Sequence, residues 1–402
     1  MAVRPGNHWW WDVLENGPSS LYASYFDVDW DPPDERLHNR VLLPVLADHY
    51  GRTVDGGGIS VAREGGAFFV LYGDDRFPAA PRSLDGILWR AADAVASDDL
   101  AAFADAFAGL PPAGATDRES VDRRHRDKEA LRRWLQRLLA DDDAVARAVD
   151  EVIAKLNSDP DELDQFLQRQ NYRLAFWGTA RRELDYRRFF DISELAGLRI
   201  EDPEVFADTH QRVLAWLADG TLDGVRVDHV DGLRDPEGYL RRLHERAPDA
   251  WVVVEKILES RERLPSSWPV QGTTGYDFTN LVGGLFVDPA GEAALTAVYA
   301  SFTGDPAGWD DVVYASKELV VRDVLASELA RLTTLFSDVA AAHRTTRDFT
   351  RWELREALAE VLAAFPVYRT YAVAGRPATE DERRYVSAAV ETAADRRPDI
   401  DR

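Results

Sequence analysis

Two acidic residues near the middle of the chain have the types and spacing needed for acid–base chemistry. Asp228 ends the segment 223–228, Asp-Gly-Val-Arg-Val-Asp, and Glu255 ends the segment 251–255, Trp-Val-Val-Val-Glu. Both segments predict short strands, and the second is almost wholly apolar, which is typical of buried strands. Adjacent parallel strands lie about 4.7–4.9 Å apart, and a retaining glycosidase needs its two carboxyl groups about 5–5.5 Å apart. The pair is therefore suited to glycosyl transfer through a nucleophile and an acid/base.

The neighbouring residues suggest which carboxyl group has which role. Arg226 precedes Asp228 by two residues, so both side chains should leave the same face of the strand, and a guanidinium there favours the charged carboxylate of a nucleophile. Glu255 follows apolar residues, which favour the neutral form of a general acid. His229 is expected to donate a hydrogen bond at the rim of the site. The alternative is a structural ion pair, because Asp and Glu commonly end strands.

Other chemistries lack the motifs that they require. Asp228, His229 and Asp231 form an acid–histidine cluster, but no second histidine at helical spacing and no calcium-loop pattern accompanies it, so no metal is expected. The sequence has no Gly-x-Ser-x-Gly and no Gly-x-Gly-x-x-Gly, which disfavours a serine triad or a dinucleotide fold.

Composition excludes further classes of protein. The 402 residues include 48 Lys and Arg against 71 Asp and Glu, a net charge of −23, so neither nucleic acid nor a membrane surface is an expected partner. The absence of Cys rules out disulfides, thiol nucleophiles and thiolate metal sites. No apolar run reaches the roughly 18 residues of a membrane helix, and no signal-peptide core follows Met1. These features predict a soluble, cytoplasmic protein.

The elements expected to position Asp228 and Glu255, which we call the acid pair, form a βαβ unit. A helix over 235–244 separates the strands 223–228 and 251–255, and the second strand should be buried on both faces of a parallel sheet because it is almost wholly apolar. An amphipathic helix is predicted over 205–217. A long helix buried along one stripe is predicted over 317–342.

The first half of the chain has a different pattern. Residues 1–30 are rich in aromatics and turn formers without a clear period and predict loops, in which Trp9 is a candidate for stacking on a sugar. The apolar spacing over 37–49 predicts a helix, and 58–72 predicts a β-hairpin. The region 83–155 is predicted to be helical with two breaks.

Several segments resemble a known family. The segment 223–233, Asp-Gly-Val-Arg-Val-Asp-His-Val-Asp-Gly-Leu, resembles the nucleophile motif of the α-amylase superfamily of glycoside hydrolases, and 252–258, Val-Val-Val-Glu-Lys-Ile-Leu, resembles its acid/base motif. Other segments are similar to the maltooligosyltrehalose synthases in particular; they lie at 9–20, 172–177, 185–192, 272–278 and 284–288.

The resemblance implies an α/β fold, an incomplete (β/α)8 TIM barrel with a large, mostly helical insertion and a small β-hairpin. Residues 1–200 would contain the aromatic loops, the helical insertion and the hairpin. Residues 201–402 would contain a partial barrel, with strands near 223–228 and 251–255, and a helical C-terminal part.

The resemblance also implies an activity, in which the reducing-end α-1,4 linkage of a maltooligosaccharide is converted to α,α-1,1 by intramolecular transglucosylation. Asp228 would be the nucleophile and Glu255 the acid and base, with no metal or cofactor. Substrate-binding residues would be Arg226, His229, Trp9, Tyr276 and Asp277, although a turn-and-cap role suits the last two equally. A trehalose-releasing hydrolase would be the functionally coupled partner.

Two departures from the family pattern predict a fragment. The third carboxylate of the family follows a Thr-His motif that is absent here, and we expect it beyond Arg402. The early Asn-His-Met motif is also absent, and Met1 resembles its methionine. The chain alone is thus expected to lack a closed barrel and to be inactive. The alternatives are an α-glucan hydrolase of the same superfamily and a non-catalytic carbohydrate-binding remnant of a split gene.

Overall fold

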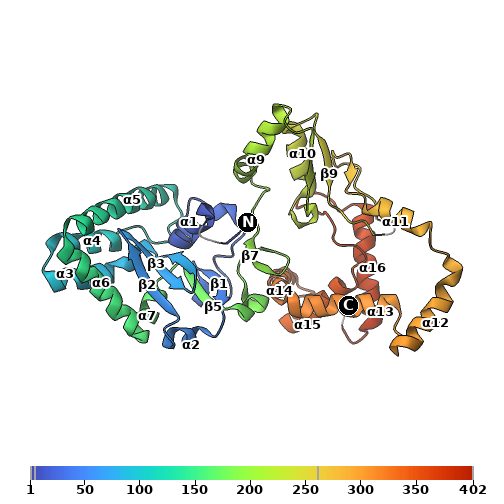
Figure 1. Cartoon of the computed structure of the whole chain (residues 1–402). Coiled ribbons are helices and arrows are strands. Elements are labelled where there is room, and N and C mark those ends of the chain that lie inside the picture. The colour runs from blue at the N-terminus through green and yellow to red at the C-terminus, as the bar shows by residue number, and fades with distance from the viewer. Residues whose placement is uncertain (1, 4–5, 260–261, 401–402) are drawn as a thin grey trace. The chain divides into compact units, whose positions relative to one another are not determined.

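The computed structural model describes residues 2–3, 6–259 and 262–400, and the chain divides into two compact units, Met1–Arg199 and Ile200–Arg402 (Figure 1). The fold is mixed α/β with several small sheets. The strands of the described residues form two three-stranded and two two-stranded sheets and no closed barrel.

A two-stranded parallel sheet in the first unit corrects one prediction. The segment 37–49 was predicted to be a helix, but β1 (Val41–Leu46) is a strand that pairs with β5 (Tyr172–Phe176). The prediction is wrong because the apolar run Val-Leu-Leu-Pro-Val-Leu is a short strand that is buried on both faces. Periodicity alone does not distinguish such a strand from a segment of buried helix. Pro44 also disfavours a helix interior.

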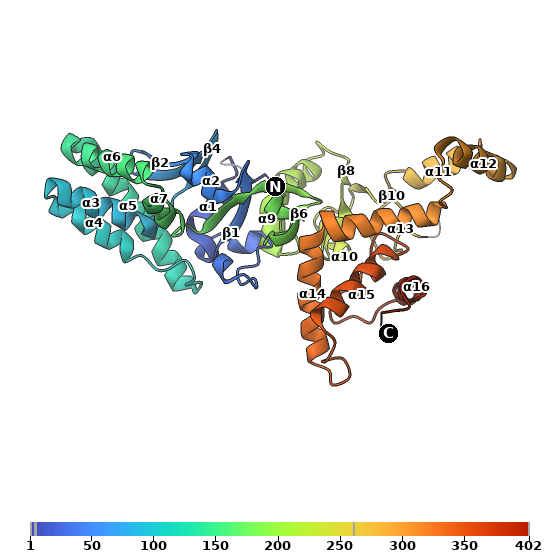
Figure 2. The same ribbon diagram turned by 90° about the horizontal axis from the view of Figure 1, so that it is seen from below.

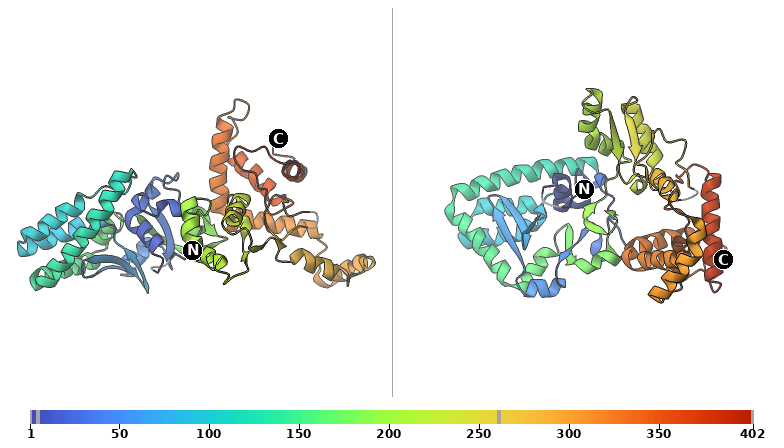
Figure 3. Two further views of the ribbon diagram at one scale, coloured as in Figure 1. Left: turned by 90° about the horizontal axis from the view of Figure 1, so that it is seen from above. Right: turned by 45° about the vertical axis from the view of Figure 1, so that its right-hand side comes forward.

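The predicted hairpin is confirmed and gains a third strand. Strands β2 (Ile59–Glu64) and β3 (Ala67–Tyr72) pair antiparallel, and β4 (Asp75–Pro78) adds to β3. At the hairpin turn, a Cβ on Gly66 would lie 2.5 Å from the carbonyl oxygen of Arg132. The glycine therefore lets the turn approach the backbone of the long teal helix α5 (Figure 3).

Helices account for most of the remainder of the first unit, as the pattern over 83–155 predicts. Asp142 is both the C-cap of α5 and the N-cap of α6. Its side chain accepts hydrogen bonds from the backbone N–H groups of Ala144 and Val145. The helices are α3 (Asp85–Val95), α4 (Asp98–Ala108), α5 (Arg118–Asp141), α6 (Asp143–Ser158) and α7 (Pro160–Leu167). Smaller elements are α2 (Tyr50–Asp55), α8 (Ala180–Glu183), β6 (Arg188–Phe189) and β7 (Ile192–Ala196).

The three consecutive tryptophans lie on a helix, α1 (His8–Asn16), and not in the predicted loops. The Asn7 side chain caps this helix by accepting from the backbone N–H of Trp10 at 3.4 Å. Trp10 and Val13 are buried, so packing of one face stabilises a segment whose bulky aromatics have only modest helix propensity.

The second unit contains the predicted βαβ arrangement. Strands β8 (Gly224–Val227) and β9 (Trp251–Val254) are parallel and are separated in sequence by α10 (Pro236–Arg246); the predicted helix over 205–217 is α9 (Pro203–Ala218). A third parallel strand, β10 (Gly272–Thr273), completes the order β10-β9-β8 and was not predicted.

Strand β9 is buried on one face only. Val252 and Val254 are 3% and 0% exposed, whereas Trp251 is 62% exposed. The prediction of two buried faces is wrong, because alternate side chains point to opposite faces and only the face of Val252 and Val254 is fully covered.

The C-terminal part of the second unit is helical, and its predicted long helix is broken. A π-helical segment, Val320–Val324, separates α13 (Trp309–Leu319) from α14 (Ala326–Ala341), and the two helices diverge at this point (Figure 2). The predicted buried stripe is also wrong, since Leu335 is 57% exposed. The remaining helices are α11 (Tyr276–Gly284), α12 (Glu292–Thr303), α15 (Arg351–Ala363) and α16 (Glu380–Arg396).

The segment from α11 to α13 exposes many large apolar side chains. Leu285, Phe286, Phe302 and Trp309 are 81%, 86%, 90% and 78% exposed. In the part of the chain that the structure describes, no single helix is long and apolar enough to cross a membrane. One bent pair of helical segments, Tyr276–Gly284 with Pro289–Thr303, has the length and apolar composition of a membrane span, and only these two properties suggest one.

Candidate active site

The register of β8 and β9 brings the acid pair to one edge of the sheet. Val227 pairs with Val254, and Asp228 and Glu255 are the next residue on each strand. The backbone N–H of Glu255 donates to the carbonyl oxygen of Val227 at 2.8 Å, which extends the pairing beyond the two strands. Both side chains therefore leave the carboxyl ends of neighbouring parallel strands, the edge where α/β proteins commonly bind ligands.

A single guanidinium links the two carboxylates. Nε of Arg226 donates to Oδ1 of Asp228 at 2.5 Å, and Nη2 of Arg226 lies 3.8 Å from Oε1 of Glu255. The side chains are 54%, 61% and 31% exposed for Arg226, Asp228 and Glu255. The contact agrees with the prediction that residues 226 and 228 share a face. The two carboxylates thus lie close together and remain open to a ligand.

Glu255 has a polar partner on the neighbouring loop. Its Oε2 accepts a hydrogen bond from the backbone N–H of His229 at 2.9 Å. His229 adopts a left-handed conformation, with φ of 53°. With the Arg226 guanidinium also near, the carboxylate does not have the wholly apolar surroundings that its strand suggested. His229 reaches the acid pair through its backbone N–H, whereas the sequence suggested a side-chain donor.

A glycine determines where the His229 ring can lie. A Cβ on Gly232 would lie 2.2 Å from Cδ2 of that ring. Only glycine therefore leaves room for the imidazole to fold back over the turn that follows β8, and the turn is closed by a hydrogen bond from the Gly232 N–H to the His229 carbonyl at 2.9 Å.

A buried lysine connects the loops that follow β8 and β9. Lys256 is 1% exposed, and its Nζ lies 3.2 Å from Oδ2 of Asp231 and 2.9 Å from Oε1 of Glu262. Because Lys256 follows Glu255 directly and Asp231 lies three residues after Asp228, this ion pair restrains the positions of both acid-bearing segments.

Two residues near the C-terminus of the chain form hydrogen bonds with the loop that follows β8. The Tyr371 hydroxyl donates to Oδ1 of Asp231 at 2.5 Å, and Nη1 of Arg369 donates to the carbonyl oxygens of Asp231, at 2.9 Å, and Leu233. Burial, with the hydrogen bond to Asp231, raises the pKa of Tyr371, so the phenol stays a donor.

Sequence reasoning missed Lys256, Arg369 and Tyr371. The available signal was the scarcity of lysine, which occurs at four positions, one of them directly after Glu255. For Arg369 and Tyr371 we find no comparable signal, because their partners lie more than 130 positions away.

The unpredicted strand β10 brings two further candidates to this edge. Thr273 pairs with Val254, so Tyr276 and Asp277 follow the carboxyl end of the strand beside β9. Oδ1 of Asp277 accepts from the Thr273 hydroxyl at 2.6 Å, which lowers the pKa of Asp277. Asp277 lies in the first turn of α11, where a carboxylate is stabilised by the helix dipole, but no side chain caps the start of this helix at Gly275. Tyr276 is 43% exposed, and substrate binding by both residues stays a prediction.

Trp9 belongs to the first unit. Its ring stacks with Tyr22 at a centroid distance of 6.0 Å and meets the edge of Tyr25 at 5.0 Å. It is half-buried in this aromatic cluster, and its role as a sugar platform stays a prediction. Within residues 2–3, 6–259 and 262–400, no group of three or more His, Asp or Glu side chains is arranged to hold a metal ion.

Comparison with curated proteins gives the family relationship. No family model matches the chain. A Mycobacterium tuberculosis protein named "Putative maltooligosyl trehalose synthase" is 35% identical over 341 residues, which are 84% of this chain and 32% of that protein, and the same match occurs in a second strain. The chain thus spans about a third of the length of the curated relatives it matches.

Solved structures agree with this relationship. The maltooligosyltrehalose synthase from Arthrobacter ramosus is 32% identical with a TM-score of 0.67, and the match covers 100% of this chain and 39% of that one. A Sulfolobus tokodaii protein described as a hypothetical maltooligosyl trehalose synthase is similar in fold, with a TM-score of 0.62 at 23% identity over 98% of this chain and 40% of that one.

Fold and site together define a mixed α/β protein with a pair of carboxylates at the carboxyl edge of a short parallel sheet. This chain is homologous to the maltooligosyltrehalose synthases over most of its length and covers roughly two fifths or less of theirs.

Proposed function

We propose that Asp228 and Glu255 carry out the intramolecular transglucosylation of a maltooligosyltrehalose synthase. The observation that supports this most strongly is the neighbouring register of β8 and β9, with Arg226 in contact with both carboxylates. Strands at this spacing suit the short carboxyl separation of a retaining mechanism. In this proposal the sheet β10-β9-β8 is part of a (β/α)8 barrel.

In the first step, Asp228 attacks the anomeric carbon of the penultimate glucose unit. The bond from that carbon to O4 of the reducing-end glucose breaks as Glu255 gives its proton to the departing oxygen. A covalent glycosyl–Asp228 ester and a bound glucose result.

In the second step, the released glucose turns within the site and presents its own anomeric hydroxyl. Glu255 accepts the proton of that hydroxyl while its oxygen attacks the ester-linked carbon and displaces Asp228. The new linkage is α,α-1,1, so the product is non-reducing. Exclusion of water decides rearrangement over hydrolysis. Such a product is the substrate of a trehalose-releasing hydrolase, the functional partner that the family implies.

A hybrid enzyme tests the proposal at full length. The aligned 84% of this chain would replace the matching region of the mycobacterial relative, and the purified hybrid would be incubated with maltopentaose. We expect reducing ends to disappear without release of free glucose. Asp228→Asn and Glu255→Gln should each lower the rate by at least about a thousandfold, since each removes a group that acts in both steps.

Asp223→Asn is the matched control, because Asp223 precedes the amino end of the same strand and is exposed. It should leave the rate within about twofold. Growth of reducing ends in the hybrid would indicate a hydrolase, and near-normal turnover by either acid-pair variant would contradict the assigned roles. The chain by itself is expected to give no product.

A further inference from the structure

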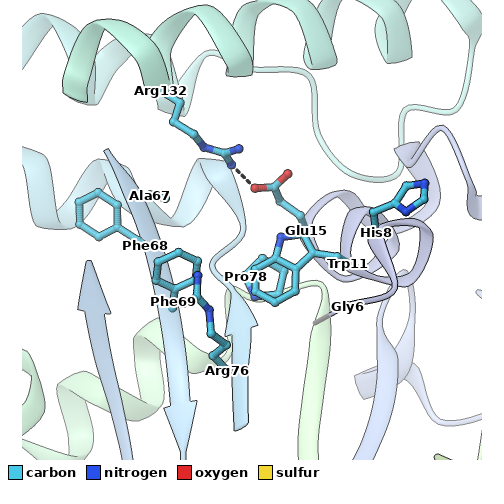
Figure 4. Close-up of a pocket in the computed structure, with 10 residues that line it drawn as sticks. All are labelled: Gly6, His8, Trp11, Glu15, Ala67, Phe68, Phe69, Arg76, Pro78 and Arg132. Carbon is cyan, nitrogen blue, oxygen red and sulfur yellow. Dashed lines mark hydrogen bonds and ion pairs between the residues drawn. The ribbon is translucent and has the colours of Figure 1, made fainter. Parts of the chain in front are cut away.

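A cavity in the first unit lies between α1, the hairpin sheet and α5. Its volume is about 560 Å³, within the range of about 300–1,000 Å³ typical of small-molecule sites. Trp11 and Glu15 contribute from α1, Phe69 and Arg76 from β3 and β4, and Arg132 from α5 (Figure 4). These residues are not part of the acid pair, which belongs to the second unit.

One wall of the cavity is aromatic. The rings of Trp11 and Phe69 lie 6.1 Å apart at a tilt of 54°, and the Arg76 guanidinium lies 4.0 Å from the Phe69 centroid and 5.9 Å from that of Trp11. The preceding residue, Trp10, is 1% exposed and packs into the core, but Trp11 is only half-buried and lines the cavity. An indole with an open surface beside a guanidinium offers an apolar platform and hydrogen-bond donors together.

The other wall is polar and balanced in charge. Glu15 is 4% exposed, and its carboxylate pairs with Lys128 at 2.5 Å and with Arg132. Burial alone would raise the pKa of Glu15, but the two cations outweigh it and hold the pKa below its ordinary value. Arg132 also pairs with Glu129 at 3.1 Å, and Arg76 with Glu64 at 3.2 Å. Since both lining arginines are already paired with carboxylates, the cavity favours a neutral polar ligand over an anion.

We propose that this cavity is a saccharide-binding site that takes glucose units of an α-glucan. The apolar face of a sugar ring would pack on Trp11, and its hydroxyls would bond to Arg76, Arg132 and the Glu15 carboxylate. The choice of an α-glucan among neutral polyols rests on the proposed function. The existence of a site for a neutral polyol does not, because it is argued from the aromatic platform, the paired arginines and the cavity volume.

Calorimetric titration of the whole chain with maltotriose tests this site without requiring catalysis. We expect saturable binding that Trp11→Ala and Arg76→Ala each weaken by about tenfold, because they remove the platform and a donor. Trp134→Ala is the matched control, since that tryptophan is 54% exposed on the same helix as Arg132 but does not line the cavity. It should bind as the unaltered chain does.

Further variants separate misfolding from loss of the site and from failure of the proposed function. Trp11→Phe keeps a ring and the packing of α1, so it should bind more tightly than Trp11→Ala. The double variant Asp228→Asn, Glu255→Gln removes the acid pair and should retain the binding that depends on Trp11, whatever its effect on the hybrid enzyme. Unchanged affinity in Trp11→Ala, or no saturable binding by chain with native near-UV circular dichroism, would overturn the proposal.

Discussion

The first unit buries the apolar faces of its helices, whereas part of the second unit leaves them open. Helices α3 and α6 pack against each other with fully buried residues such as Leu88 and Val149. Helices α11, α12 and α13 have no buried residue among those described. Both regions are apolar enough to form a core, so the difference shows that an apolar face in the sequence predicts burial only where another element lies against it.

Hydrogen exchange should give the largest contrast between these regions. Isolated helices shorter than about 12–15 residues are marginal in water, and α11 and α12 have 9 and 12 residues. We expect their amides to exchange at least about a thousandfold faster than those of α6, whose opening requires disruption of the core. The measurement is exchange followed by mass spectrometry of peptides. Equal protection of α6 and α12 would show that something covers the open face.

Lys128→Ala should strongly destabilise the first unit. Lys128 is 2% exposed and pairs with the buried Glu15, and removing one partner of such a pair costs about 3–5 kcal/mol. Urea unfolding measures this change in the free energy of unfolding. The control is Lys155→Ala, on the exposed side of α6, for which less than about 0.5 kcal/mol is expected. Similar effects of both substitutions would refute the importance of the buried pair.

The stability of the first unit should also depend on pH through Asp185. Its side chain accepts hydrogen bonds from the Leu42 N–H at 3.1 and 3.0 Å, and burial raises its pKa to about 8. Because the folded state then holds the proton more tightly than the unfolded state, this carboxyl group stabilises the unit fully below about pH 4, and that stabilisation is lost as pH rises toward about 8.

Asp185→Asn keeps an acceptor for Leu42 without a charge. It should raise the free energy of unfolding at pH 8 by roughly 2–4 kcal/mol and flatten its fall between pH 5 and 8. Urea unfolding at several pH values checks both changes. A variant with the same slope as the unaltered chain would contradict the role given to Asp185.

Tyr371→Phe should give the smallest of these effects, in the second unit. It removes one hydrogen bond to the charged Asp231, worth about 1.5–3 kcal/mol. Tyr385→Phe on α16 is the matched control, because the Tyr385 ring contacts Arg384 through its face and Phe keeps that face. This substitution should hardly change the free energy of unfolding. Faster hydrogen exchange of amides 229–234 in Tyr371→Phe alone would locate the effect at the loop after β8. Identical exchange in both variants would contradict the role of the Tyr371–Asp231 hydrogen bond in holding this loop.

The sequence predicts the acid-bearing strands well because a βαβ unit is local. The segment 251–255 is almost wholly apolar, the short segment 223–228 is bounded by aspartates, and about 30 residues contain the whole unit. β10 was missed because a strand of 2 residues has no period. α1 was missed because its tryptophans are weak helix formers, and only the tertiary burial of Trp10 and the cap at Asn7 reveal its stability. The contacts of Arg369 and Tyr371 depend on tertiary structure, which no local pattern encodes.

Identification of the covalent nucleophile tests the central claim most directly. The hybrid enzyme would be treated with a ring-fluorinated glucosyl fluoride, whose ester with the enzyme breaks down slowly, and digested for mass spectrometry. The fluoride leaves without an acid, so labelling should persist in Glu255→Gln and vanish in Asp228→Asn. The account predicts the fluoroglucosyl mass on the peptide that contains Asp228. A label on another carboxylate, in a hybrid that converts maltopentaose, would contradict it.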